Sequence, residues 1–81
     1  MRITVLCFAE LAEALGTGSL SIELEHGADV QQVLADLASA HPAIETRLAT
    51  LAVAVNDRYA TRTQVLDDGD TVALIGPVSG G

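Results

Sequence analysis

Three short segments of the chain alternate between apolar and polar residues, and this alternation predicts strands with one buried face. They span residues 2–8, 19–25 and 71–75. The side chains expected to face the core are Ile3, Val5, Cys7, Leu20, Ile22, Leu24, Val72 and Leu74. Each strand is therefore expected to bury one face against the core and to leave the other face open.

A helical pattern replaces the alternation after Gly27. Apolar residues recur there at the i, i+3, i+4, i+7, i+8 spacing of a helix laid on a sheet. They are Val30, Val33, Leu34, Leu37 and Ala38. Asp29 is placed to cap the first free amides of this helix, and Gln32 is placed to reach back as in a capping box. His41-Pro42 ends the helix, because the residue before a proline is pushed out of helical geometry.

Weaker patterns predict the connecting elements. These are a short helix at 10–15, a helical piece at 43–49 with Ile44 and Leu48 turned inward, a hairpin over 51–60 that reverses at Asn56-Asp57, a bridge at 65–66 and a turn at 67–70. The ββαββ order predicts an α+β protein of the β-grasp (ubiquitin-like) class, with a mixed sheet of about four to five strands and one main helix across one face. In that arrangement the last strand lies in the middle of the sheet, parallel to the first.

Composition and charge narrow the function. A chain of 81 residues, 49% of them apolar, can bury one modest core, so we expect a single domain over residues 1–81. The net charge of -7 argues against nucleic-acid binding, because phosphate contacts need clustered positive charge. No apolar run approaches the ~20 residues of a membrane span, so we expect no membrane contact and a cytoplasmic protein.

The cysteine and the histidines form no metal-binding pattern. Cys7 is the only cysteine and lies within an apolar strand, so we expect a buried small hydrophobe rather than a reactive thiol. His26 and His41 lie far apart, each next to a turn signal, which favours surface or capping roles. The acidic turn at 67–70 lacks the longer loop and the closing glutamate of a calcium site. We therefore expect no metal site and no permanently bound cofactor.

Residues 76–81 are predicted to form an extended C-terminal functional tail. Two glycines at its end make the thinnest peptide available, which suits a narrow enzymatic channel, and Pro77 stiffens its start. The terminal carboxylate is a poor electrophile until another group activates it, so chemistry at Gly81 requires a partner enzyme. The alternative is an ordinary frayed chain end without a function.

Strand alternation also predicts an apolar patch on the face of the sheet that the main helix leaves open. Leu6 and Phe8 fall on that face of the first strand, with Ala73 and Ile75 beside them on the last strand. Tyr59 is expected to join them from the neighbouring hairpin. Such a cluster commonly marks a binding site. The alternative is that Phe8 folds over the sheet edge into the core.

The chain resembles the MoaD/ThiS family over its whole length, most closely its MoaD branch. The resemblance rests on the strand Val5-Leu6-Cys7-Phe8-Ala9, the main helix, Ala54-Val55-Asn56, Leu66-Asp67-Asp68-Gly69-Asp70 and the ending Pro77-Val78-Ser79-Gly80-Gly81. It departs from many relatives in having Gly76 before Pro77 and Leu74-Ile75 where aromatic residues are frequent. Neither departure touches the terminal glycines.

The resemblance implies a sulfur carrier without catalytic side chains of its own. An E1-like adenylyltransferase (MoeB-like) would use ATP to adenylate the carboxylate of Gly81, next to Gly80, and sulfur would then give a thiocarboxylate. The loaded tail would enter the large subunit of molybdopterin synthase (MoaE-like), in a heterotetramer, and supply sulfur for the dithiolene of molybdopterin. The implied partner-binding residues are Phe8, Tyr59, Ile75, Pro77, Val78 and Ser79.

Three alternatives stay open at this point. Carriers of the thiamine pathway share the fold and the Gly-Gly ending. A ubiquitin-like modifier would join Gly81 to lysines of other proteins; the chain itself contains no lysine, so it could not form lysine-linked chains on itself. A plain interaction domain with an inert tail is the third alternative.

Overall fold

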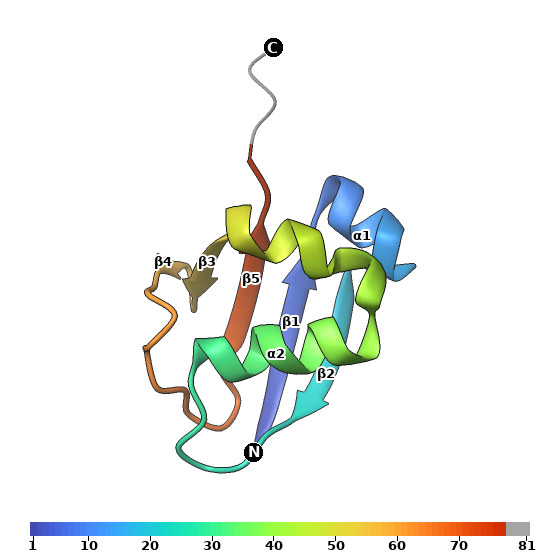
Figure 1. Cartoon of the computed structure of the whole chain (residues 1–81). Coiled ribbons are helices and arrows are strands. Elements are labelled where there is room, and N and C mark those ends of the chain that lie inside the picture. The colour runs from blue at the N-terminus through green and yellow to red at the C-terminus, as the bar shows by residue number, and fades with distance from the viewer. Residues whose placement is uncertain (78–81) are drawn as a thin grey trace.

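A five-stranded mixed sheet forms the centre of the protein in the computed structural model, which describes residues 1–77 (Figure 1). Its strands are β1 (Arg2–Cys7), β2 (Ser19–Glu23), β3 (Ala52–Val55), β4 (Arg58–Tyr59) and β5 (Thr71–Ile75). The order is β2-β1-β5-β3-β4, with β1 and β5 parallel and the other pairs antiparallel. The predicted β-grasp fold is confirmed, and the last strand lies in the middle of the sheet as expected.

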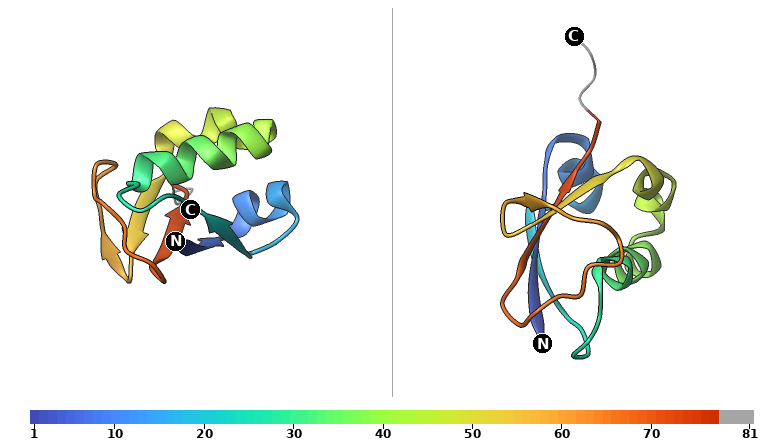
Figure 2. Two further views of the ribbon diagram at one scale, coloured as in Figure 1. Left: turned by 90° about the horizontal axis from the view of Figure 1, so that it is seen from below. Right: turned by 90° about the vertical axis from the view of Figure 1, so that its left-hand side faces the viewer.

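The helical elements are α1 (Ala9–Leu15), α2 (Val30–Ala40) and the 3-10 helix η1 (Pro42–Thr50). α2 and η1 lie together on one side of the sheet and leave the other side uncovered by them (Figure 2). The expected helical piece after Pro42 is thus present but has 3-10 geometry, and Ile44 anchors it in the core with no exposed surface.

Local signals placed most boundaries correctly. β1 ends at Cys7, one residue before the predicted end, because Phe8 already caps α1; β2 ends at Glu23, two residues early. The cap on α2 is confirmed, since the Asp29 carboxylate accepts a hydrogen bond from the backbone N–H of Gln32 at 3.1 Å. The reciprocal half of the capping box is wrong, because the side-chain amide of Gln32 donates forward to Asp36 instead, at 3.0 Å.

One continuous core lies between the sheet and α2. The predicted apolar faces of β1, β5 and α2 supply its centre, and full burial of each such side chain stabilises the fold by about 1.5–3 kcal/mol. The largest side chains without appreciable exposure are Ile3, Val5, Val30, Val33, Leu34, Leu37, Ile44, Val72 and Leu74. The periodicity of 2 in the strands and of 3.6 in the helix therefore predicted the two surfaces, one on the sheet and one on α2, that enclose this core.

Two turns fix the start of β5. Asn56 and Asp57 both have left-handed backbones, with φ of 49° and 70°, which suits the tight reversal of a hairpin. The Asn56 side chain accepts a hydrogen bond from the N–H of Thr71 at 3.0 Å and donates one to Asp70 at 2.9 Å. Asp70 also accepts from the N–H of Asp67 at 2.8 Å. The acidic turn therefore has a structural role, and within residues 1–77 no cluster of three or more metal-ligating side chains occurs.

Ala9 is strained in a way that the sequence did not predict. Its φ is 48°, in the left-handed region that an L side chain disfavours by about 1–2 kcal/mol. We expect Ala9→Gly to raise the free energy of unfolding by about 0.5–1 kcal/mol, because relief of this strain exceeds the added entropy of the unfolded glycine. Urea denaturation measures the change. Ala14→Gly, on the same helix, is the control and should lower stability; a loss of stability in both variants would contradict the assignment of strain.

None of the helices within residues 1–77 is long and apolar enough to cross a membrane.

Candidate functional site: the open sheet face and the start of the tail

The register of the strands assembles a continuous apolar row on the uncovered face of the sheet. Leu6 lies opposite Ala73, Ala73 lies opposite Ala54, and Ala54 lies opposite Tyr59. Because opposite residues in a sheet point to the same side, these side chains form one row across β1, β5, β3 and β4. Ile75 lies on the same side as Ala73, two residues nearer to the tail.

Two large exposed side chains, Phe8 and Tyr59, lie on this face of the sheet. The Phe8 backbone is extended (φ −133°, ψ 156°), which continues the alternation of β1 and turns its side chain away from buried Cys7. Phe8 is 53% exposed and Tyr59 is 78% exposed, whereas Ala54 between them is 7% exposed. The alternative placement of Phe8 in the core is therefore wrong. We call Leu6, Phe8, Ala54, Tyr59, Ala73 and Ile75 the open-face patch.

The open face changes character along the strands. At the end opposite to the patch, Arg2 and Glu23 face one another and form an ion pair of 2.9 Å. Thr4 lies between Ser21 and Thr71 in the next row. The apolar half of the face is consequently the half beside the C-terminal end of β5, where the tail begins.

The tail starts from the best-held strand of the sheet. β5 pairs with β1 on one side and with β3 on the other, and Leu74 has no exposed surface. Gly76 and Pro77 follow directly and are exposed. A fraying of β5 would break hydrogen bonds on two edges at once, so the point at which the tail leaves the domain is fixed (Figure 1). The predicted site residues Val78, Ser79, Gly80 and Gly81 lie outside the described residues.

Comparison with known proteins shows the family of the chain. The model of the ThiS family matches residues 5–81. The chain belongs to the ThiS family. It is 40% identical to the molybdopterin synthase sulfur carrier subunit of Chlamydomonas reinhardtii, over the full length of both chains.

Solved structures resemble this ThiS-family protein over its whole length as well. The crystal structure of SAMP1 from Haloferax volcanii has a TM-score of 0.91 and 31% identity, covering 100% of both chains. A chain in the complex of subunits 1 and 2 of the molybdopterin-converting factor from Helicobacter pylori matches with a TM-score of 0.74 and 26% identity, again covering 100% of both chains.

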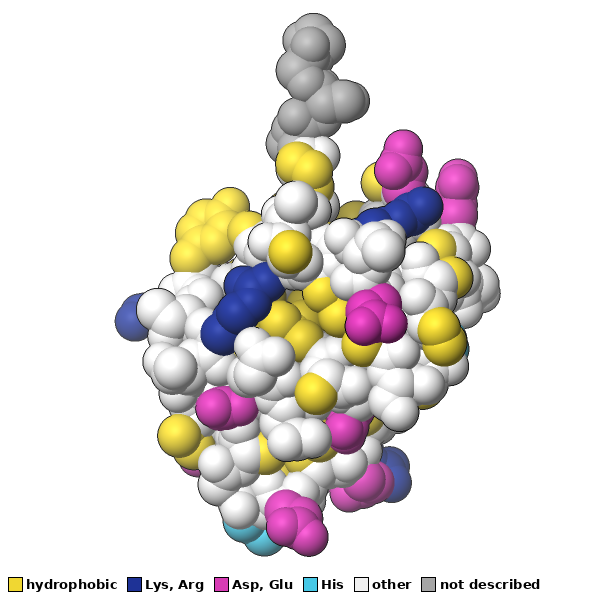
Figure 3. Space-filling view, in the orientation of Figure 1, with side chains coloured by type: hydrophobic (Ala, Val, Ile, Leu, Met, Phe, Trp, Pro, Cys, Tyr) yellow, Lys and Arg dark blue, Asp and Glu magenta, His cyan; other side chains and the backbone are white. Residues whose placement is uncertain are grey.

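The side of this ThiS-family protein that carries the helices has a hollow with apolar and charged lining residues. A hollow of about 270 Å³ lies between α2 and η1, with Leu34 and Leu48 among its lining residues. Acidic and basic groups lie around apolar atoms on this side (Figure 3). Arg62, which also lines the hollow, donates to the backbone oxygen of Leu48 at 2.6 Å and so fastens the end of η1. Arg47 similarly donates to the backbone oxygen of Glu10 at 3.3 Å.

Cys7 is confirmed as a buried residue, with 3% of its surface exposed. Burial raises the pKa of its thiol, because a thiolate would lose its hydration. Burial and the raised pKa therefore disfavour thiol chemistry at Cys7 in the folded protein.

Cys7 should make the stability of the fold decrease at high pH. Its unfolded thiol ionises near pH 8.5, whereas the folded thiol ionises at a higher pH, so the stabilising contribution is complete below about 8.5 and declines above it. We expect the free energy of unfolding to fall between about pH 8 and 10, and to fall less steeply in Cys7→Ala. Urea denaturation across this range measures both slopes. Equal slopes would contradict the prediction.

Sequence reasoning missed two contributors to the site. Ala54 was assigned to the alternating hairpin without a role, although its small side chain lies between Tyr59 and Ala73. The strained Ala9 directly after Phe8 carried no signal, because alanine ordinarily favours right-handed helix. The position of Ala54 follows from the pairing of β3 with β5. The left-handed backbone of Ala9 follows from the sharp turn from β1 into α1.

Proposed function

We propose that this protein is a sulfur carrier that acts as the small subunit of molybdopterin synthase, with the carboxylate of Gly81 as the site of loading. The observation that carries the proposal is the start of the tail on central strand β5, beside the open-face patch. The full-length similarity to a molybdopterin synthase sulfur carrier subunit supports it.

The chemistry takes place at the terminal carbonyl. An activating enzyme of the E1-like (MoeB-like) class would bind ATP, and a carboxylate oxygen of Gly81 would attack its α-phosphorus with loss of pyrophosphate. The acyl adenylate then has a good leaving group, and a sulfur nucleophile displaces AMP to give the thiocarboxylate. The carrier itself holds no cofactor permanently in this scheme. Its body presents the tail and binds the partner.

The open-face patch would bind the partners. Phe8 and Tyr59 are large, exposed aromatic side chains. Side chains of this kind often contribute a large share of the binding free energy at protein interfaces. Ile75 adds an aliphatic side chain next to Pro77 and the tail. One patch would serve the activating enzyme and the large (MoaE-like) synthase subunit in turn, since both must reach the same tail. The complex of subunits 1 and 2 in Helicobacter pylori supports a two-subunit arrangement. We place these encounters in the cytoplasm.

Intact mass spectrometry tests the proposal. The protein is purified from its own cells, with and without the gene of its activating enzyme. We expect a species in which one oxygen is replaced by sulfur, present only when the activating enzyme is present. Only unmodified protein under both conditions, in cells that make molybdopterin, would overturn the proposal.

A second function, conjugation to other proteins, is favoured by the similarity to the small archaeal modifier SAMP1. In that case Gly81 would form an amide with lysines of target proteins. Because this chain has no lysine, each conjugation would add a single copy rather than a chain. Adducts of higher mass that contain the Gly81 amide would support this function.

A further inference from the structure

The outer edge of β2 presents unpaired backbone groups. The hydrogen-bonded pairs with β1 include residue 24, whose N–H donates to Met1 at 2.9 Å, and residue 18, whose oxygen accepts from Cys7 at 2.9 Å. In an antiparallel pair such residues alternate, so Ser21 and Glu23 direct their N–H and C=O groups away from β1. Within residues 1–77, β2 is the end strand of the sheet and no strand pairs with this edge.

The apolar side chains of β2 are incompletely covered. Leu20 and Ile22 point toward the helix side but remain half-buried, whereas Val5 and Ile3, which lie opposite them on β1, have no exposed surface. Both residues belong to the strand at the edge of the sheet. An added strand would cover them and would satisfy the backbone groups of Ser21 and Glu23, the arrangement called β-augmentation.

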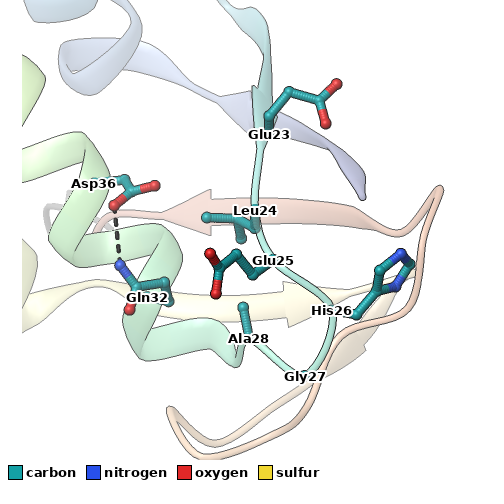
Figure 4. Close-up of a pocket in the computed structure, with 8 residues that line it drawn as sticks. All are labelled: Glu23, Leu24, Glu25, His26, Gly27, Ala28, Gln32 and Asp36. Atoms are coloured by element: carbon teal, nitrogen blue, oxygen red, sulfur yellow. Dashed lines mark hydrogen bonds between the residues drawn. The ribbon is translucent and has the colours of Figure 1, made fainter.

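An acidic groove continues from the end of this edge. It has a volume of about 470 Å³ and runs between the segment after β2 and helix α2 (Figure 4). Its lining residues include three carboxylates, those of Glu23, Glu25 and Asp36. Glu23 is paired with Arg2, but within residues 1–77 neither Glu25 nor Asp36 has a cationic partner within 4 Å. Two carboxylates are thus available to a basic ligand.

We propose that the edge of β2 and this groove form a second binding site, which takes an extended segment of a partner protein that carries lysine or arginine. The segment adds a strand next to β2, and its basic side chains meet Glu25 and Asp36. The proposal goes beyond the sulfur-carrier function. Glu23 lies at the end of β2 that pairs with the start of β1, whereas the tail leaves from the opposite end of the sheet, so both sites can be occupied together (Figure 1).

A second copy of the chain is a poor occupant of this edge. Antiparallel pairing of β2 with itself around Ser21 would place Glu25 of each copy opposite Thr17 of the other, so no basic side chain would meet the groove carboxylates. The net charge of -7 on each copy also disfavours their association. A basic partner segment has the opposite sign and is favoured on the same grounds.

A synthetic peptide of alternating lysine and valine is the probe, and a peptide of alternating glutamate and valine is its control. Both are titrated into the isotope-labelled full chain and followed by amide chemical shifts. We expect the lysine peptide to shift residues 19–28 and 32–36 and to slow hydrogen exchange of the Ser21 and Glu23 amides. The glutamate peptide should have no effect.

Two variants separate strand addition from general attraction to an acidic protein. Glu25→Gln with Asp36→Asn should weaken the lysine peptide roughly three- to tenfold, whereas Glu13→Gln with Glu45→Gln, which removes the same charge elsewhere, should not. Ser21→Pro removes an outward N–H at a position where an edge strand tolerates proline, and should also weaken binding.

Three results would overturn the proposal. The first is a set of shifts centred on the acidic turn at 67–70, and the second is an equal loss of peptide affinity in the two double variants. The third is a set of shifts that depends on protein concentration alone. Deletion of Gly81 should leave peptide binding unchanged, so failure of the sulfur-carrier function and failure of this site are distinguishable.

Discussion

Deletion of Gly81 is expected to abolish loading and sulfur transfer while leaving the fold unchanged. Without this residue the activated carboxylate belongs to Gly80 and lies one residue short, up to about 3.5 Å from its required position. An activating site that holds the reacting atoms within bonding distance does not tolerate such a displacement. Within residues 1–77, all residues that form the core lie before Gly76, so thermal stability should not change.

The measurement compares formation of the thiocarboxylate by intact mass in wild type, the deletion and a variant with one added alanine. Both altered chains should remain unmodified, with a loss of at least about 100-fold in rate. Gly80→Ala is the milder test, because its Cβ widens the tail without changing its length, and it should load more slowly than wild type. Normal loading of the deletion variant would refute the assignment of Gly81.

Phe8→Ala and Tyr59→Ala are each expected to weaken binding of the large synthase subunit by about 1–3 kcal/mol, the range of interface hot spots. Both side chains are more than half exposed, so their removal costs the isolated protein little stability. The same variants should weaken binding of the activating enzyme if one patch serves both partners. Calorimetric titration with each purified partner measures the change.

Val65→Ala is the matched control for these variants. Val65 is a large apolar side chain with 60% exposure, comparable to that of Phe8, but it lies in the bridge to Asp29 rather than on the open face. Its truncation should change the affinity for the large synthase subunit and the affinity for the activating enzyme by no more than about 0.5 kcal/mol each. If Val65→Ala weakens binding as much as Phe8→Ala does, the open-face patch is not the interface. Thermal melting of all three variants separates lost contacts from lost folding.

Ile75→Ala provides a more demanding comparison. Ile75 is half-buried beside Ala52 in the pairing of β3 with β5, so its truncation should lower both affinity and stability. We expect the loss of stability to be smaller than the 2–5 kcal/mol typical of a fully buried isoleucine.

Local patterns in the sequence were sufficient wherever one short segment decided the outcome. The alternation in residues 71–75 gave β5 its correct bounds, and Asp29 was correctly placed as the cap of α2. The turn at Asn56-Asp57 followed from residues that tolerate left-handed backbones. The Gly-Gly ending, which directs attention to Gly81, is likewise a property of consecutive residues, and its chemical role stays a prediction.

The tertiary structure decided the order and the register of the strands in the sheet. Strand alternation predicted Phe8 and Tyr59 on one face, but the insertion of β5 between β1 and β3 is what places Ala54 and Ala73 between them. It also leaves β2 at an edge, next to an acidic groove that α2 completes. Hydrophobic periodicity determines which face of each strand is buried. The pairing of strands depends on contacts between residues that are distant in sequence, and the entropy lost and the contact energy gained by these contacts depend on the assembled sheet.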